Sequence, residues 1–154
     1  MRLEPLTAAH VADLRRIRAE PGVLHWWDPP EDDFPLHDAP ELTRFAVIVD
    51  GAVAGMIQYG EDLDPKYKSA SIDLFLDPAV HNRGVGTAAI REVVRILVEE
   101  RGHHRITMDP AVDNAAGIRA YTKVGFEPVG VMRNYERDPG GEGWHDALLM
   151  ELVL

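Results

Sequence analysis

Residues 77–88 read DPAVHNRGVGTA, and this stretch decides the predicted fold. It follows residues 71–77, in which apolar and polar side chains alternate as they do in a strand. It leads into residues 84–101, where apolar residues recur at helical spacing. Two glycines, Gly84 and Gly86, let the backbone at the helix start come close to a ligand. Because unpaired N–H groups and the helix dipole meet there, the turn is suited to a phosphate group.

A Gly-x-Gly turn on its own leaves two interpretations open. The same pair of glycines also occurs in tight strand-to-helix turns that bind nothing. The stretch has no third glycine for a dinucleotide fingerprint, and no Gly-Lys-Ser/Thr for a P-loop. The two common nucleotide loops are therefore excluded, while an anion-binding turn and a plain turn both remain.

The order of predicted elements gives the fold class. The strand–helix–strand unit in the second half predicts one parallel pair inside a mixed, mostly antiparallel sheet. We expect an α/β (α+β) fold with six to seven strands flanked by helices, and a single domain over residues 1–154. The remaining elements are strands at 1–6, 43–49, 52–59, 104–108, 126–133 and 144–153, helices at 8–20 and 114–123, a short helix within 23–30, and a polar loop at 60–69.

Composition narrows the function classes. The chain has 154 residues, 45% of them hydrophobic, which is enough for one core and excludes a disordered or collagen-like chain. Its net charge of −10 disfavours nucleic-acid binding and favours cationic partners. The absence of cysteine excludes disulfides, thiolate metal sites and cysteine nucleophiles. The histidines show no metal-ligand spacing, so no metal is expected. With neither a signal peptide nor a membrane span in the sequence, we expect a cytoplasmic protein that does not enter a membrane.

Two segments together resemble the GNAT superfamily of N-acetyltransferases, whose members use acetyl-coenzyme A (acetyl-CoA). Residues 81–86, HNRGVG, are similar to that family's (Gln/Arg)-x-x-Gly-x-(Gly/Ala) loop, with His81 in place of Gln or Arg. Residues 114–126, NAAGIRAYTKVGF, are similar to its Asn-x-x-Ala-x-x-x-Tyr-x-x-x-Gly-Phe segment, with Gly117 in place of alanine. The resemblance implies a GNAT-type domain in which the fourth and fifth strands are splayed apart.

The resemblance also implies which residues bind the coenzyme. The backbone of Leu74, Phe75 and Leu76 would pair with the pantetheine arm, and Asn114 would contact the same arm. Tyr121 would lie beside the sulfur and protonate the departing thiolate, although a packed aromatic residue is the alternative reading of Tyr121. The pyrophosphate would be held by residues of one loop, namely His81, Asn82, Arg83, Gly84, Val85, Gly86 and Thr87.

Two aspartates, Asp73 and Asp109, are the candidate acceptor site. They stand near the ends of adjacent predicted strands, where paired carboxylates would attract a protonated amine and Asp73 would take its proton. Each is also a common strand-end residue beside a turn, and that reading stays open. Within the superfamily the chain is most similar to aminoglycoside 6′-N-acetyltransferases, in which aspartates matching these two act as the base and bind amino groups. The similar stretches are Trp26-Trp27, Ile72-Asp73, Thr107–Pro110 and 114–126.

The predicted reaction is therefore direct acetyl transfer from acetyl-CoA to the 6′-amine of an aminoglycoside, a polycation that suits an acidic protein. Trp26 and Trp27 would stack on sugar rings or cations, or else anchor a short helix to the core. Trp144, His145 and Asp146 are further candidates for the acceptor pocket, with His145 alternatively a surface imidazole. Other acceptors stay open: a siderophore hydroxylysine, a polyamine, or a protein or peptide N-terminus. A non-catalytic binding module, and either a monomer or a homodimer, also stay open.

Overall fold

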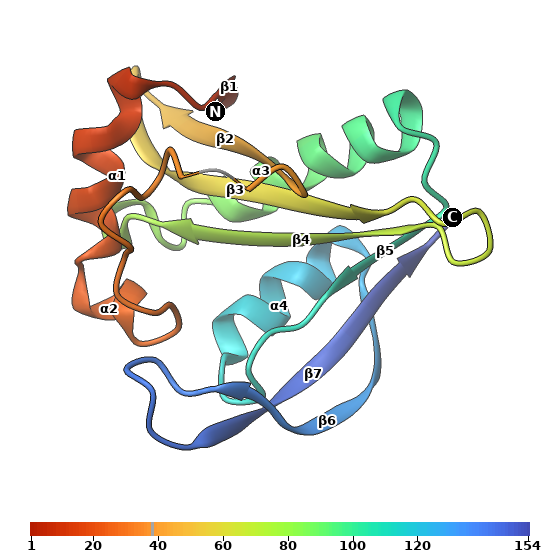
Figure 1. Ribbon diagram of the computed structural model, residues 1–154. Helices are drawn as coiled ribbons and strands as arrows, with labels where there is room; N and C mark the ends of the chain where they lie inside the picture. The colour runs from red at the N-terminus through yellow and green to blue at the C-terminus, as the bar shows by residue number, and fades with distance from the viewer. Residues whose placement is uncertain (38) are drawn as a thin grey trace.

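The computed structural model describes residues 1–37 and 39–154, and its strands form one seven-stranded sheet in the order β1-β2-β3-β4-β5-β7-β6 (Figure 1). The strands are β1 (Arg2–Pro5), β2 (Leu42–Val49), β3 (Ala52–Asp62), β4 (Ser69–Leu76), β5 (Arg105–Met108), β6 (Glu127–Arg137) and β7 (Trp144–Val153). The helical segments are η1 (Ala8–His10), α1 (Val11–Arg18), α2 (Pro21–Leu24), η2 (Pro78–Val80), α3 (Val85–Arg95), η3 (Ile96–Glu100) and α4 (Ala115–Val124). This confirms the predicted mixed, mostly antiparallel sheet.

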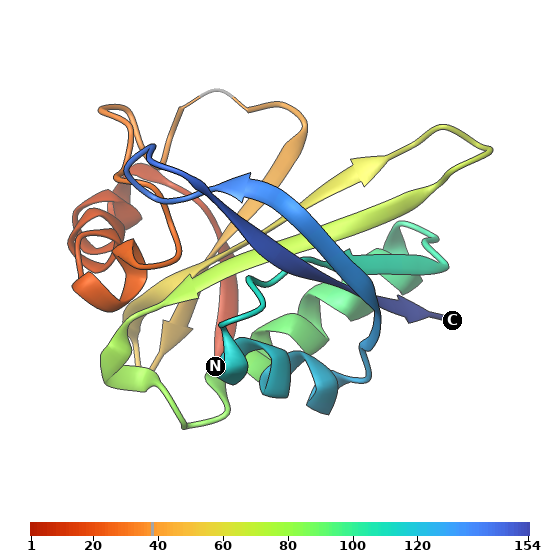
Figure 2. The same ribbon diagram turned by 90° about the horizontal axis from the view of Figure 1, so that it is seen from below.

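The pairing of β4 with β5 is the sheet's one parallel contact among the described strands, and it is short. Only two pairs connect these strands, Ala70 with Ile106 and Ser71 with Thr107. Beyond them the strands diverge, as the splayed pair of the prediction requires. In Figure 2, β6 and β7 cross the direction of β4 rather than continuing beside it. The divergence divides the sheet into two halves and leaves one edge of β4 without a strand.

Two apolar cores cover the sheet. On one face α3 and α4 pack against Ile72, Ile106 and Phe126, each at most 1% exposed. On the other face of the N-terminal half, α1 packs against β3 and the buried Phe75. Alternation along β4 explains the division, because consecutive side chains of a strand point to opposite faces.

Several boundaries differ from the sequence prediction. The predicted helix at 8–20 begins as the short helix η1, and Pro21 starts α2 instead of only ending α1. Proline is accepted there because the first helical residue needs no N–H partner. Pairing of β3 with β4 continues to Asp62 and Ser69, which shortens the predicted 60–69 loop. Among the described residues, no helix is both long and apolar enough to cross a membrane.

Candidate active site

The first turn of α3 presents free backbone donors. Gly84 is the N-cap residue, with a left-handed φ of +75°, and no side chain caps the helix. Ala88 is the first residue whose N–H is bonded within the helix, to the carbonyl of Gly84. The N–H groups of residues 85–87 therefore have no intrahelical partner and lie at the positive end of the helix dipole. This geometry fits the phosphates of a coenzyme.

The two glycines of this turn serve different purposes. Position 84 favours glycine because of its backbone conformation: a residue with a β-carbon would be strained at φ +75°, although there is open space for the β-carbon itself. Gly86 packs against β4, because a β-carbon there would lie 3.4 Å from the Leu76 side chain. The preceding Asn82 is also left-handed, with φ +61°. Together these positions bring the predicted loop of residues 81–87 to the end of β4.

The charged side chain of this loop is already in an ion pair. Arg83 lies 3.3 Å from the Asp50 carboxylate, and both side chains are largely exposed. An exposed pair of this kind contributes little to stability. Arg83 can therefore exchange Asp50 for a phosphate at small cost.

The free edge of β4 is formed by Leu74 and Leu76. The Asp77 N–H bonds to the Ala54 carbonyl at 2.7 Å, so the odd-numbered residues of β4 direct their backbone groups to β3. The Phe75 carbonyl accordingly lies against Gly55 on β3. The backbone groups of Leu74 and Leu76 point the other way, toward the diverged β5. Of the three residues predicted to pair with pantetheine, these two have backbone groups directed to the gap.

Asn114 and Tyr121 lie on α4. Asn114 is its N-cap, and its Oδ1 accepts the N–H of Gly117 at 3.0 Å. A β-carbon at Gly117 would come within 2.6 Å of the Asn114 Nδ2, so alanine at this position would require the Asn114 side chain to shift. Tyr121 packs against the main core, and burial, together with the charges of Asp73 and Asp109, raises its pKa. The residue predicted to protonate the thiolate therefore lies close to both predicted acceptor carboxylates.

Asp73 and Asp109 occupy equivalent positions on the two diverging strands. Each lies two residues beyond the last parallel pair, Ser71 with Thr107. The Asp73 side chain is reached by solvent, yet the protein around it removes much of its hydration. This desolvation, with the charges of Asp109 and Glu136, raises the pKa of Asp73 to about 7. Burial also raises the pKa of Asp109, against a hydrogen bond from Tyr135 that lowers it.

Two residues of β6, Tyr135 and Glu136, lie beside these aspartates. The Tyr135 hydroxyl interacts with Asp109, and this contact with a carboxylate raises the pKa of Tyr135 to about 12. Burial and the charge of Asp109 raise the pKa of Glu136, against a lowering effect of His145. Sequence reasoning missed both residues, because it ended the strand at residue 133. We refer to Asp73, Asp109 and Glu136 as the acidic cluster.

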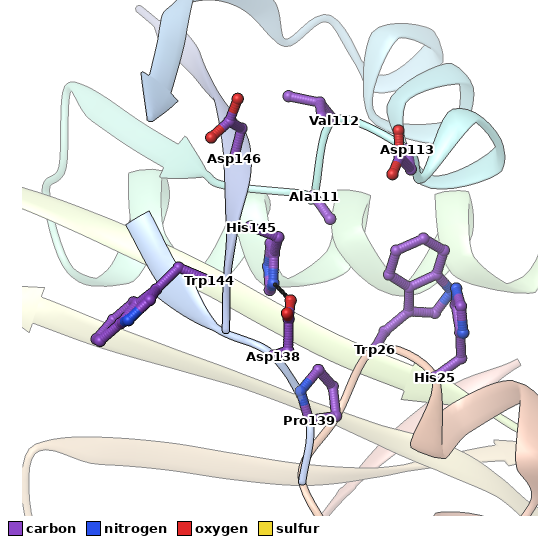
Figure 3. Close-up of a pocket in the computed structure, with 10 residues that line it drawn as sticks. All are labelled: His25, Trp26, Ala111, Val112, Asp113, Asp138, Pro139, Trp144, His145 and Asp146. Atoms are coloured by element: carbon purple, nitrogen blue, oxygen red, sulfur yellow. Dashed lines mark hydrogen bonds and ion pairs between the residues drawn. The ribbon is translucent and has the colours of Figure 1, made fainter. Parts of the chain in front are cut away.

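The two adjacent tryptophans have different surroundings. Trp27 packs edge-to-face on Phe75, with ring centroids 5.2 Å apart, and the Arg18 guanidinium lies 4.9 Å from its ring. This position matches the anchoring alternative. Trp26 instead lines an open cleft of about 400 Å³ next to the 109–113 segment. Figure 3 shows its indole ring on the side of the cleft opposite His145.

The far wall of this cleft comes from β7 and the loop before it. Trp144, His145 and Asp146, the further candidates for the acceptor pocket, all line this cleft. His145 is not an isolated surface imidazole: its Nδ1 lies 3.0 Å from Asp138, and its Nε2 lies 3.5 Å from Glu136. The cleft therefore adjoins the acidic cluster through His145. No group of three or more His, Asp or Glu side chains among the described residues could hold a metal ion.

Comparisons with known proteins agree with this geometry. A model of the Acetyltransferase (GNAT) family matches residues 11–126. The L-amino acid N-acetyltransferase AaaT of Escherichia coli K12 is 28% identical over 134 residues, covering 79% of this chain and 80% of the relative. The structure of aminoglycoside acetyltransferase AAC(6′)-Ib with coenzyme A and kanamycin has a TM-score of 0.79 at 24% identity, covering 98% of this chain and 93% of that one. A spermidine N-acetyltransferase chimera of Vibrio cholerae SpeG and hSSAT has a TM-score of 0.80 at 17% identity, with 99% and 96% coverage.

The match to the family covers most of the chain and includes all of α3 and α4, where the free N–H groups and Tyr121 lie. It confirms the predicted family, the predicted class of enzyme and acetyl-CoA as the acyl donor. The chain belongs to the GNAT family of acetyltransferases.

Proposed function

We propose that the enzyme acetylates an amino group of a polycationic small molecule, with the 6′-amine of an aminoglycoside as the first candidate. The observation that carries this proposal is the acidic cluster at the end of the diverged strands. Neither Asp73 nor Asp109 has an ion-pair partner among the described residues, so both carboxylates are available to an incoming cation. A second ammonium group of the acceptor would be attracted by the same site.

The proposed chemistry uses Asp73 as the base. The acceptor arrives as an ammonium ion and transfers a proton to Asp73, directly or through a water molecule. The free nitrogen then attacks the thioester carbon, the carbon–sulfur bond breaks, and the nitrogen's second proton passes to the leaving sulfur, directly or through water, so that coenzyme A is released as the thiol. A carboxyl group with a pKa of about 7 is well matched to this task near neutral pH.

Tyr121 is proposed to interact with the leaving sulfur. Its raised pKa keeps it protonated, so it can always donate a hydrogen bond to the thiolate. The same shift makes full proton transfer harder than it would be from an unperturbed phenol. The chain has no cysteine that could form a thioester intermediate, which supports direct transfer in a ternary complex.

The charges of the site also distinguish the acceptor classes. A free amino acid carries a carboxylate next to its amine, and that carboxylate would be repelled by the acidic cluster. One arginine of β6, Arg137, already pairs with Asp28 at 3.5 Å. Polyamines share the charge of aminoglycosides and remain the main alternative, followed by a hydroxylysine side chain and a peptide N-terminus.

A substrate panel tests the proposal. Release of free thiol from acetyl-CoA is followed with kanamycin, spermidine, hydroxylysine, an alanine-initiated peptide and a neutral L-amino acid. We expect the highest kcat/KM with kanamycin, product NMR showing acetylation at the 6′-nitrogen, and at least 100-fold lower kcat/KM with the amino acid. Asp73→Asn should still bind coenzyme A in calorimetry but lose turnover. A kcat/KM for the amino acid equal to or above that of the polycations would refute the proposal.

A further inference from the structure

Strand β6 contains an irregularity next to the acidic cluster. Met132 pairs with Ala147 and Glu136 pairs with His145, so residues 133–135 lie opposite the single residue Asp146. Asn134, within this bulge, has a left-handed φ of +48°. Its N–H donates to the Asp146 Oδ1 at 2.8 Å. The Asp146 carboxylate therefore holds the strained residue of the bulge.

Asp146 is itself fixed to the segment that follows Asp109. Its carbonyl accepts the N–H of Val112 at 3.0 Å, and the neighbouring Ala147 bridges to Ala111. One residue thus connects the β6 bulge and the strand end that carries Asp109. In Figure 3 the Asp146 carboxylate and the His145 ring project in opposite directions from β7.

The bulge explains how two consecutive side chains, Tyr135 and Glu136, both influence Asp109. In a regular strand, neighbours such as Tyr135 and Glu136 point to opposite faces. Here the Tyr135 hydroxyl interacts with Asp109, and Glu136 lies close enough for its charge to interact with Asp109 and Asp73. A bulge redirects side chains in this way, and bulges are often found beside active sites.

We propose that Asp146 is a positioning residue for the acceptor: through the bulge at Asn134 it directs Tyr135 to Asp109 and brings the charge of Glu136 near it. In this role the Asp146 Oδ1 acts as a hydrogen-bond acceptor for the Asn134 N–H, and the negative charge of Asp146 is not required. The proposal rests on the proposed function, because it assigns the acidic cluster to the acceptor amine.

Paired substitutions separate the hydrogen bond from the charge. Asp146→Asn keeps an oxygen acceptor and loses the charge, whereas Asp146→Ala loses both. We expect Asp146→Ala to raise the KM for the cationic acceptor at least 10-fold while the KM for acetyl-CoA changes less than twofold. Asp146→Asn should restore the acceptor KM to within threefold of the original. Asn134→Gly, which tolerates a positive φ, should behave like Asp146→Asn, and Asn134→Val like Asp146→Ala.

A spectroscopic measurement tests the geometry without turnover. In protein labelled with ¹³Cζ-tyrosine, the Tyr135 signal is identified by its loss in Tyr135→Phe. That signal should shift in Asp146→Ala and Asn134→Val but not in Asp146→Asn or Asn134→Gly. The proposal is overturned if Asp146→Asn is as impaired as Asp146→Ala, which would mean that the charge acts directly, or if Asp146→Ala changes neither the signal nor the KM. Failure of the unmodified enzyme with every polycation would refute the proposed function alone, because the tyrosine signals would still decide the role of Asp146.

Discussion

Replacing Asp73 with asparagine should stabilise the folded protein at alkaline pH while removing its activity. The pKa of Asp73 is raised from 3.8 to about 7 in the folded state. Below pH 3.8 the carboxyl is neutral in both the folded and the unfolded chain. Between these two values the unfolded chain releases the proton and the folded chain keeps it, so a rise in pH favours unfolding. Above about pH 7 the carboxyl is ionised in both states, and the folded state is destabilised by the full amount.

The pKa shift of Asp73 sets an upper limit on how much its ionisation lowers the free energy of unfolding. About three pKa units at 1.36 kcal/mol each correspond to at most ~4 kcal/mol. Because solvent reaches the Asp73 side chain, screening reduces this figure, and we expect ~1–2 kcal/mol. Asparagine has nearly the same shape and carries no charge at any pH. The variant should therefore exceed the original protein in free energy of unfolding at pH 8 by ~1–2 kcal/mol more than it does at pH 4.

Urea denaturation at pH 4, 6 and 8 measures this difference. Asp32→Asn is the matched control, because it removes a carboxylate from an exposed loop with the same change in formal charge. Added spermidine or kanamycin should reduce the difference in free energy of unfolding between Asp73→Asn and the original protein at pH 8, since a bound cation stabilises the Asp73 carboxylate. A stability difference between Asp73→Asn and the original protein that is the same at all three pH values would refute the reasoning.

Three further substitutions test other parts of the site. Tyr121→Phe should lower kcat by about 10–100-fold with little change in the KM for acetyl-CoA, measured by steady-state thiol release; an unchanged kcat would leave Tyr121 a packing residue. Gly84→Val should cost ~1–2 kcal/mol of backbone strain and weaken coenzyme A binding in calorimetry, so equal affinity would contradict a role for this turn. Arg18→Met removes two hydrogen bonds to the Asp28 carbonyl, at 2.7 and 3.1 Å, and stacking on three aromatic rings. It should lower the free energy of unfolding by ~2–4 kcal/mol in urea titrations, and a loss below 0.5 kcal/mol would contradict the stabilising role of Arg18.

The sequence was most informative where local rules decide the structure. Alternation over residues 71–77 correctly predicted β4 and the two faces of its side chains. The Gly84-Val85-Gly86 turn was predictable because glycine at position 84 readily adopts the left-handed conformation of the N-cap. Asp73 and Asp109 could be placed side by side because a strand–helix–strand unit brings the carboxyl ends of its strands together.

The remaining features depend on contacts between distant segments. Tyr135 and Glu136 follow a bulge at Asn134, whose N–H donates to Asp146 on the next strand, and no local pattern of the sequence predicts this pairing. Trp26 and Trp27 are chemically identical neighbours, and only the placement of Phe75 and Arg18 decides which of them is packed into the core. Glu61 pairs with Arg101 at 2.9 Å and with His103 at 2.6 Å, and both contacts join segments that are far apart in the sequence.

The gap between β4 and β5 has a consequence for the whole molecule. Two residue pairs join the halves of the sheet. The backbone groups of Leu74 and Leu76 that point into the gap could form hydrogen bonds with an extended ligand, which would take the place of a strand. The melting temperature should then rise with the concentration of acetyl-CoA. A ligand that binds only the folded chain adds ~2.7 kcal/mol to the free energy of unfolding at a free concentration 100 times its Kd. Protein without bound acetyl-CoA would be less stable, and the gap between β4 and β5 would be the first region to unfold on heating or to be cleaved by a protease.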